Sequence, residues 1–128
     1  HETLRRDARV IALEKTDARA LNADLIADPV TAMVADVSFI SLRKALPAAL
    51  GLVAPGAWLV ALVKPQFEVG REGVGKGGVV RDPELQQQAV DDIRHWLVSD
   101  IGWTIKGVIP SPIAGGDGNQ EYLVGAWK

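Results

Sequence analysis

The chain has 128 residues, 48% of them hydrophobic and 23% charged, and a net charge of −2. This composition is typical of one compact domain or part of one, and it excludes nucleic-acid binding through bulk charge, so that such binding needs a local basic patch. The absence of cysteine excludes a disulfide framework and a thiolate metal site. No apolar run approaches the ~18 residues of a membrane span, and we expect a cytoplasmic protein. The first ten residues, HETLRRDARV, do not begin with Met, and their amphipathic pattern is typical of the end of a helix. We therefore expect this chain to be a piece of a longer protein.

Three short apolar runs in the first half of the chain predict strands: Ala8–Leu13, Val30–Val37 and Ala57–Val63. Each run is apolar without clean alternation, which is typical of strands covered on both faces. Between the second and third strands the sequence predicts a helix that Ser41 caps. This helix is expected to carry Val53 on its inner face, to bend at Pro47 and to stop at residues 55–56, Pro-Gly.

The second half of the chain predicts one helix and two strands. The helix is expected from about Pro83 to Val98, and the strands at Trp103–Ile109 and Tyr122–Trp127. Alternation of strands and helices predicts an α/β sheet with right-handed crossovers, and the last two strands predict a C-terminal antiparallel hairpin.

A glycine-rich segment, EVGREGVGKGGVVRD at residues 68–82, contains the pattern G-x-x-x-x-G-K. A phosphate-binding loop with this pattern follows a strand directly, opens a helix directly and carries Ser or Thr after the lysine. Here Gly77 follows Lys76, and the next predicted helix begins only at Asp82, with Pro83 in the first helical position. The glycines therefore need another explanation.

Charged residues stand where three predicted strands meet one rim of the sheet. Asp36 ends the second strand, Lys64 follows the third, and Glu121 begins the last. Ligands bind beyond the carboxyl ends of parallel strands in open α/β sheets, and neighbouring strands lie about 4.8 Å apart. Because the last strand is expected to run antiparallel, its beginning lies at the same rim. The sequence therefore predicts that these three side chains converge, although each could also be a solvated strand end.

The segments ADVSFISLRKALPAAL, LVALVKPQFEVGREGVGKGGVVRD and PSPIAGGDGNQEYLV closely resemble the TlyA family. Members of this family are S-adenosylmethionine-dependent 2′-O-methyltransferases of ribosomal RNA, often labelled hemolysin A-like, with an FtsJ-type catalytic domain. The resemblance covers nearly the whole chain. It implies a Lys-Asp-Lys-Glu tetrad in which Asp36, Lys64 and Glu121 take the last three places, with the first lysine upstream.

The resemblance also implies a fold class, a Rossmann-like class I methyltransferase sheet with strand order 3-2-1-4-5-7-6. Residues 1–128 then form a partial FtsJ-like domain that holds strands 3 to 7. Strands 1 and 2, the glycine-rich turn for the methionine end of the cofactor, the acidic residue for its ribose and an S4-like RNA-binding domain are expected upstream. The sheet would be incomplete, and the bare edge of Val30–Val37 should pair with Ala8–Leu13 or, in a homodimer, with a second copy.

A mechanism follows from the resemblance. A ribose 2′-hydroxyl must lose its proton as it attacks the sulfonium methyl group, and Lys64 either accepts this proton or orients the hydroxyl. Burial and nearby positive charge favour a neutral lysine, whereas Asp36 and Glu121 favour a charged one, so both roles stay open. No metal is expected.

Three further candidates are weaker. The segment EKTDAR resembles a turn that contacts adenine in such enzymes. Asp17 is therefore a candidate for cofactor binding, together with Asp36. An Asp that only starts a short helix fits the sequence equally. Phe39 is expected to line the cofactor or target pocket, or to be a core aromatic. Asn119 is expected to fix Glu121 or to contact the substrate, or to serve only its own turn.

The glycine-rich segment directly follows Lys64 and carries Arg71, Lys76 and Arg81. Glycines let the backbone approach a ligand closely, and cations suit RNA phosphates. We interpret the segment as a mobile lid on the substrate side of the rim; a disordered loop without contacts is the alternative.

The function expected from these observations is 2′-O-methylation of ribosomal RNA, with the ribosomal RNA or subunit as partner and S-adenosylmethionine as cofactor. This piece alone is expected to be inactive. Two other classes remain: an inactive RNA- or protein-binding module on the same fold, and a membrane-lytic protein. The lytic class ranks last because no hydrophobic or amphipathic lytic segment is visible.

Overall fold

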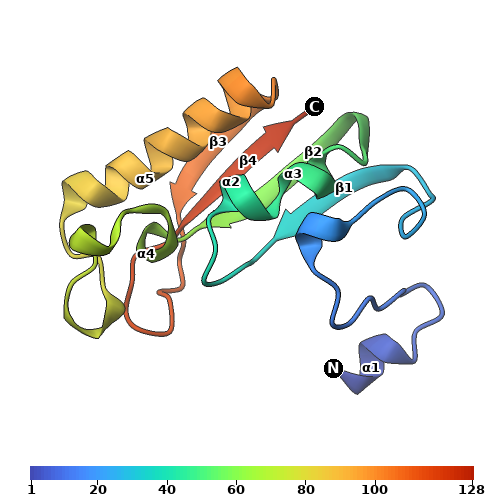
Figure 1. Cartoon of the computed structure of the whole chain (residues 1–128), viewed down its shortest axis with the longest axis horizontal. Helices are drawn as coiled ribbons and strands as arrows, with labels where there is room; N and C mark the ends of the chain where they lie inside the picture. Colours follow the sequence, from blue (N-terminus) through green and yellow to red (C-terminus); the bar gives the residue numbers. More distant parts are fainter.

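The computed structural model describes all 128 residues, which form a mixed α/β fold around one four-stranded sheet (Figure 1). The spatial order is β1 (Val30–Ala35), β2 (Val53–Val63), β4 (Tyr122–Trp127) and β3 (Thr104–Pro110). The pair β1–β2 is parallel, and β4 runs antiparallel to both of its neighbours. The predicted fold class and the C-terminal antiparallel hairpin are confirmed.

Helices and short helical turns connect the strands. They are α1 (Glu2–Arg5), η1 (Ala18–Ala20), α2 (Leu42–Ala45), α3 (Pro47–Leu50), α4 (Pro65–Glu68), η2 (Arg71–Gly73), η3 (Lys76–Gly78), α5 (Pro83–His95) and the π-helical turn η4 (Trp96–Asp100). None of these helices combines the length and the apolar character that crossing a membrane requires. The expected bend at Pro47 is present, since α2 ends just before this proline and α3 begins with it.

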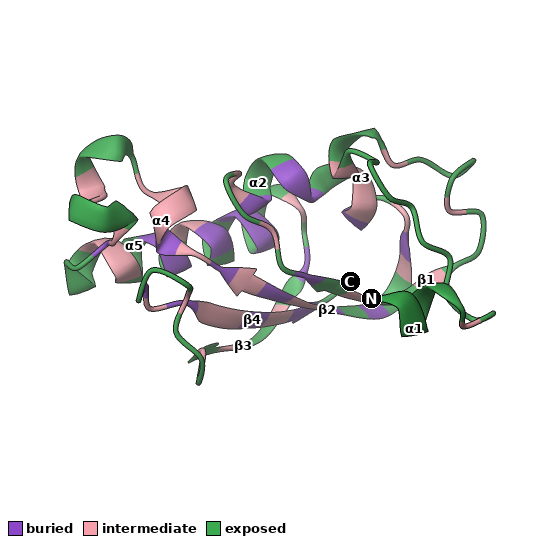
Figure 2. Cartoon of the chain, turned by 90° about the horizontal axis from the view of Figure 1, so that it is seen from below, coloured by how far each residue is buried: buried purple, intermediate pink, exposed green.

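The helices α2, α3 and α5 all lie on one face of the sheet (Figure 2). The path from β1 to β2 and on to β3 crosses the sheet in one direction, so right-handed crossovers place all the connecting helices on the same side. The other face is bare, and Val34, Trp58 and Trp127 are exposed on it. The expectation of strands covered on both faces was therefore wrong for this chain.

One hydrophobic core lies between these helices and the sheet. Its members alternate along the strands and recur along the helices, as the side-chain periods of the two structures require. The core side chains include Leu42 from α2, Leu46 between α2 and α3, Leu50 from α3, Leu59 and Val63 from β2, Ile93 and Leu97 from α5 and η4, and Val124 from β4.

The predicted strand at Ala8–Leu13 was wrong. These residues form no strand and are exposed, with Ile11 81% exposed. A strand needs a neighbour for its backbone hydrogen bonds, and in this chain no strand lies beside this segment. The outer edge of β1 is consequently unpaired, so pairing of this edge with a second copy stays a prediction. Two smaller errors concern the end of the preceding helix. Val53 begins β2 and does not belong to this helix, and residues 55–56, where the helix was expected to stop, lie within β2.

A half-buried carboxylate, that of Glu68, joins α2 to α4. The hydroxyl of Ser41 donates to Glu68 Oε2 at 2.6 Å, and the backbone N–H of Leu42 donates to Oε1 at 2.9 Å. These bonds use N–H and O–H groups at a helix start that would otherwise lack partners. Burial raises the pKa of Glu68 above its ordinary value of 4.5, although the two hydrogen bonds oppose this shift.

We expect the free energy of unfolding of Glu68→Gln, relative to that of wild type, to increase as the pH rises. The folded protein holds the Glu68 proton more tightly than the unfolded chain does, so the stability from this group is complete below pH 4.5, the ordinary pKa. This contribution is lost as the pH rises through the higher folded pKa. Urea unfolding of both proteins from about pH 4 to pH 8 measures the difference. A difference that does not change with pH would contradict the role of burial.

Candidate active site at the rim of the sheet

Three strands bring Asp36, Lys64 and Glu121 to the same rim. Asp36 follows the last residue of β1, Lys64 follows the last residue of β2, and Val63 pairs with Tyr122, which puts Glu121 beside the end of β2. All three side chains line one cavity of about 480 Å³, which residues 111–116 also line. The structure therefore brings together the three charged residues that the sequence singles out.

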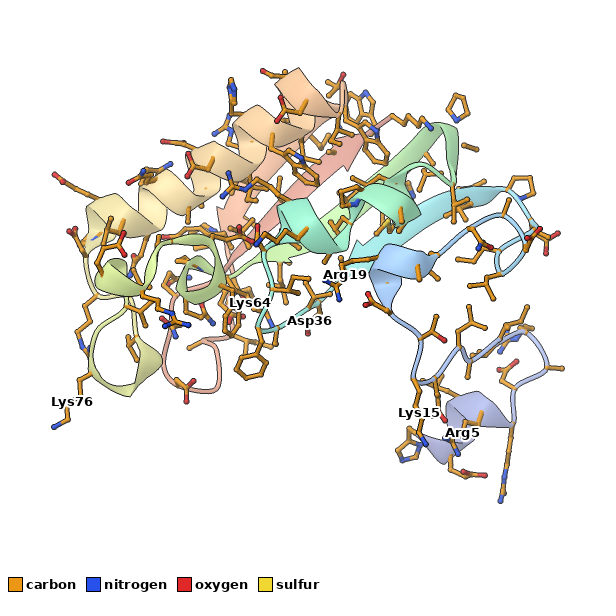
Figure 3. All side chains as sticks on the ribbon, in the orientation of Figure 1. Arg5, Lys15, Arg19, Asp36, Lys64 and Lys76 are labelled. Carbon is orange, nitrogen blue, oxygen red and sulfur yellow. The ribbon has the colours of Figure 1, made fainter.

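Lys64 forms an ion pair with Asp36 and is the less exposed member of this pair. Its Nζ lies 2.6 Å from Asp36 Oδ1 and donates to Ser38 Oγ at 3.0 Å. The Lys64 side chain is only 12% exposed, whereas that of Asp36 is 69% exposed. The pair thus joins an enclosed cation to a carboxylate that stays open to a ligand (Figure 3).

Glu121 is held differently, since its partner is Gln66 and not Lys64. The Glu121 side chain is buried, with 7% of the residue exposed, and Gln66 Nε2 donates to its Oε2 at 3.0 Å. Gly115 lies against the same oxygen so closely that an added methyl group would stand 2.5 Å from it. The rim therefore carries two separate pairs, Lys64 with Asp36 and Glu121 with Gln66.

A second cavity, of about 520 Å³, adjoins the rim on the side of α2 and α4. Its lining residues are Arg19, Phe39, Ile40, Ser41, Lys44, Gln66, Phe67 and Val69. Phe39 is 90% exposed and stands 5.0 Å from the Phe67 ring, centroid to centroid. Its φ of 64° is unusual for a bulky side chain, and such strain is concentrated at functional sites. Of the two expected roles of Phe39, that of a core aromatic is therefore wrong.

Asp17 lines neither of these two cavities. Its carboxylate caps η1 and binds the guanidinium of Arg19 at 2.7 Å. The hydrogen bonds from Arg19 lower the pKa of Asp17 to about 2. In this structure Asp17 reaches the second cavity only through its partner, Arg19.

The glycine-rich segment follows α4 and is fastened to the protein at its end. Asn119 is almost fully buried; its Oδ1 accepts from the Val80 N–H and its Nδ2 donates to the Gly78 carbonyl, both at 2.9 Å. Gly77 and Gly78 have positive φ values of 78° and 76°, which a residue with a side chain rarely adopts. Asn119 thus holds the segment and faces away from solvent, which differs from the expected contact with Glu121 or the substrate.

The three cations of this segment, Arg71, Lys76 and Arg81, are exposed and form no ion pair. Arg81 Nη1 donates to the carbonyl oxygen of Lys76, which tightens the turn. Lys76 projects from the tip of the segment into solvent (Figure 3). Their charges are therefore free to meet an anionic ligand.

Sequence reasoning missed Ser38, Gln66 and Gly115. Ser38 and Gln66 each stand two residues after a charged strand end, Asp36 and Lys64, and this spacing was a usable signal. Gly115 offered none, because its closeness to the Glu121 carboxylate arises only from the fold of the loop.

The comparisons with known proteins agree with this geometry. The FtsJ-like methyltransferase family model matches residues 1–128. The chain is 47% identical to "16S/23S rRNA (cytidine-2'-O)-methyltransferase TlyA" of Mycobacterium tuberculosis, covering 95% of this chain and 45% of that protein. It is 46% identical to "Putative rRNA methyltransferase YqxC" of Bacillus subtilis, covering 94% of this chain and 43% of that protein. The chain thus spans less than half the length of these two relatives.

A solved structure supports the same assignment. "Putative hemolysin from Streptococcus thermophilus" superposes with a TM-score of 0.92 at 38% identity, over 100% of this chain and 46% of that one. Because the family model covers every residue and the sheet is shared with a solved relative, the chain that carries this rim belongs to the FtsJ-like methyltransferase family.

Proposed function

We propose that this chain forms the catalytic part of an enzyme that methylates ribose 2′-hydroxyl groups of ribosomal RNA with S-adenosylmethionine. Two relatives of this chain are named as rRNA methyltransferases, and one of these names specifies cytidine 2′-O-methylation. The observation that carries the proposal is the enclosed Lys64, paired with Asp36 in a cavity that Glu121 also lines. The volume of this cavity, about 480 Å³, falls in the usual range of small-ligand sites.

Lys64 acts by positioning the hydroxyl. An ammonium has three N–H donors, and in the structure one points to Asp36 and one to Ser38. The third is left for a substrate oxygen. A hydroxyl that accepts this bond is held in place, and the positive charge stabilises the negative charge that grows on its oxygen as the proton leaves. Asp36 is the carboxylate next to Lys64 and is exposed, so it is placed to receive that proton.

The residues at the rim fit the charge and shape of S-adenosylmethionine in part. When bound, this cofactor supplies an electrophilic methyl group on a sulfonium. The exposed carboxylate of Asp36 suits a sulfonium cation, and the faces of Phe39 and Phe67 suit an adenine ring or a cation. We propose Asp36 and Phe39 as cofactor contacts. Asp17 contributes only by orienting Arg19.

The substrate side is proposed to be the glycine-rich segment. Its three cations, Arg71, Lys76 and Arg81, supply positive charge beside a rim whose own net charge is negative. Contacts of such cations with phosphate groups position a nucleic acid without reading its sequence. Asn119 takes part indirectly, since it fastens the end of the segment through Gly78 and Val80.

We expect Lys64→Ala in the complete protein to lower single-turnover methyl transfer by about 100-fold or more, because the hydroxyl loses its positioning group. Cofactor affinity, measured by calorimetry, should change by less than about threefold. Lys64→Arg separates the two roles: an arginine can donate to the hydroxyl but cannot accept its proton.

A measurable residual rate in Lys64→Arg, well above that of Lys64→Ala, therefore supports positioning, and equal loss in both variants supports a base. Lys106→Ala is the matched control, because Lys106 lies over the Trp127 ring on the bare face of the sheet. Transfer by Lys64→Ala at the wild-type rate would remove Lys64 from the mechanism and favour a binding module.

We predict that Gly70–Gly78 exchanges its amide protons rapidly in the free protein and slowly when ribosomal RNA is bound. Few apolar side chains anchor this segment, so ordering it costs about 1–2 kcal/mol per residue that a ligand must offset. Val80 is the internal reference, because its N–H is already bonded to Asn119. Exchange in Gly70–Gly78 that RNA leaves unchanged would contradict the lid.

We predict that the 128-residue chain alone transfers no methyl group and binds S-adenosylmethionine weakly or not at all. The sequence contains no glycine-rich turn of the kind expected to hold the methionine end of the cofactor. Calorimetry on this chain and on the complete protein gives the comparison. Micromolar binding by the chain alone would show that the rim residues suffice.

A further inference from the structure

We infer that Gln66 is a positioning residue that holds the carboxylate of Glu121 for methyl transfer. This inference rests on the proposed function, because it assigns a role at the same rim. Gln66 belongs to α4, which begins at Pro65 directly after Lys64. The backbone turn after β2 therefore determines the positions of both Lys64 and the Gln66 amide.

The carboxylate of Glu121 has no hydrogen-bond partner other than Gln66. The residue is 7% exposed, and its one side-chain hydrogen bond comes from Gln66 Nε2 at 3.0 Å. Lys64, the nearest candidate for an ion pair, binds Asp36 and Ser38 instead. A buried carboxylate costs free energy unless a hydrogen bond or a cation compensates it. In this rim the compensating group is the Gln66 amide.

The other end of the same amide has no partner of its own. Gln66 Oε1 is buried and has no hydrogen-bond partner, which is rare in folded proteins. Turning the amide by half a circle would exchange its two ends but would set Oε1 against the carboxylate of Glu121. The amide thus keeps the orientation that serves Glu121, although its own oxygen stays unsatisfied.

The space around the Glu121 carboxylate is narrow. Gly115 lies against Glu121 Oε2 and leaves no room for a side chain of its own. The same oxygen accepts from Gln66, so one contact from α4 and one from the loop between β3 and β4 fix it. Without the amide, Gly115 alone cannot hold the carboxylate in place, because it offers no side-chain donor.

Gln66 also connects the two cavities. It lines the second cavity together with Phe39 and Phe67, whereas Glu121 lines the first. Gln66 therefore lies in the wall of the second cavity and holds the carboxylate of Glu121, which lies in the wall of the first. Loss of the amide should therefore change the rate of the reaction more than the binding of either ligand.

The test uses the complete protein with Gln66→Leu and Gln66→Glu. Leucine keeps the approximate volume but removes the donor, and we expect kcat to fall about 10- to 100-fold with KM for RNA and cofactor within about twofold. Gln87→Leu is the matched control, because Gln87 is exposed on α5 and bonds only to Asp91. This control should keep the wild-type kcat.

The pH dependence of the rate of Gln66→Glu distinguishes a positioning role from a purely structural one. When the new carboxyl carries a proton it can donate to Glu121, and when both groups are charged they repel each other. The rate relative to wild type should therefore be highest at low pH and fall as the pH rises from about 5.5 to 8. A pH profile parallel to that of wild type, or an unchanged kcat in Gln66→Leu, would overturn the inference.

Crystal structures of the wild type and both variants decide the inference without an assay. The Glu121 carboxylate should leave its place beside Gly115 in Gln66→Leu and keep it in Gln66→Glu crystals grown at low pH. If the carboxylate stays in place in Gln66→Leu, Gln66 does not position it. A wild-type protein that transfers no methyl group to RNA would refute the proposed function, and the crystal structures would still decide the role of Gln66.

Discussion

The arrangement of the rim depends on the two pairings of β2. This strand lies parallel to β1 on one side and antiparallel to β4 on the other. The parallel pair sets two carboxyl ends side by side, and the antiparallel pair adds the amino end of β4. Because side chains alternate along a strand, a slip of one residue in either register would turn Lys64 or Glu121 to the other face. The core residues Leu59 and Val63, which point to the helices, oppose such a slip.

The rim encloses two charged side chains, Lys64 and Glu121, and leaves a third, Asp36, exposed. Each charge has its own partner: Asp36 for Lys64, and an amide for Glu121. Separate partners leave the carboxylate of Asp36 open to solvent while the cation and the second carboxylate are fixed. An enclosed group that is held by its neighbours needs no rearrangement when a ligand arrives, and this preorganisation is the usual source of catalytic stabilisation.

The glycines at residues 68–82 do not form a phosphate-binding loop. The segment contains the short turns η2 and η3, and α5 begins only at Pro83. Two of the glycines permit backbone angles that other residues rarely adopt, and Asn119 then fastens Gly78 and Val80 to the β3–β4 loop. The segment that presents three cations is thereby attached to the loop that carries Glu121.

The sequence by itself determined the features that depend on neighbouring residues. The ends of the apolar runs located Asp36 and Lys64, Pro47 bent the helix after β1, and Asp82 with Pro83 began α5. The family followed from long motifs, and the family model confirms it. These features are local because proline, capping residues and hydrophobic periods act within one or two turns of chain.

Only the tertiary structure decided the features that need two distant segments. The run Ala8–Leu13 has the composition of a strand, yet a strand exists only where a neighbour accepts its hydrogen bonds. Likewise Gln66 and Glu121 stand 55 residues apart in the chain, and Val80 and Asn119 stand 39 apart. No local pattern encodes such contacts, because the folded path alone brings the donor to its acceptor.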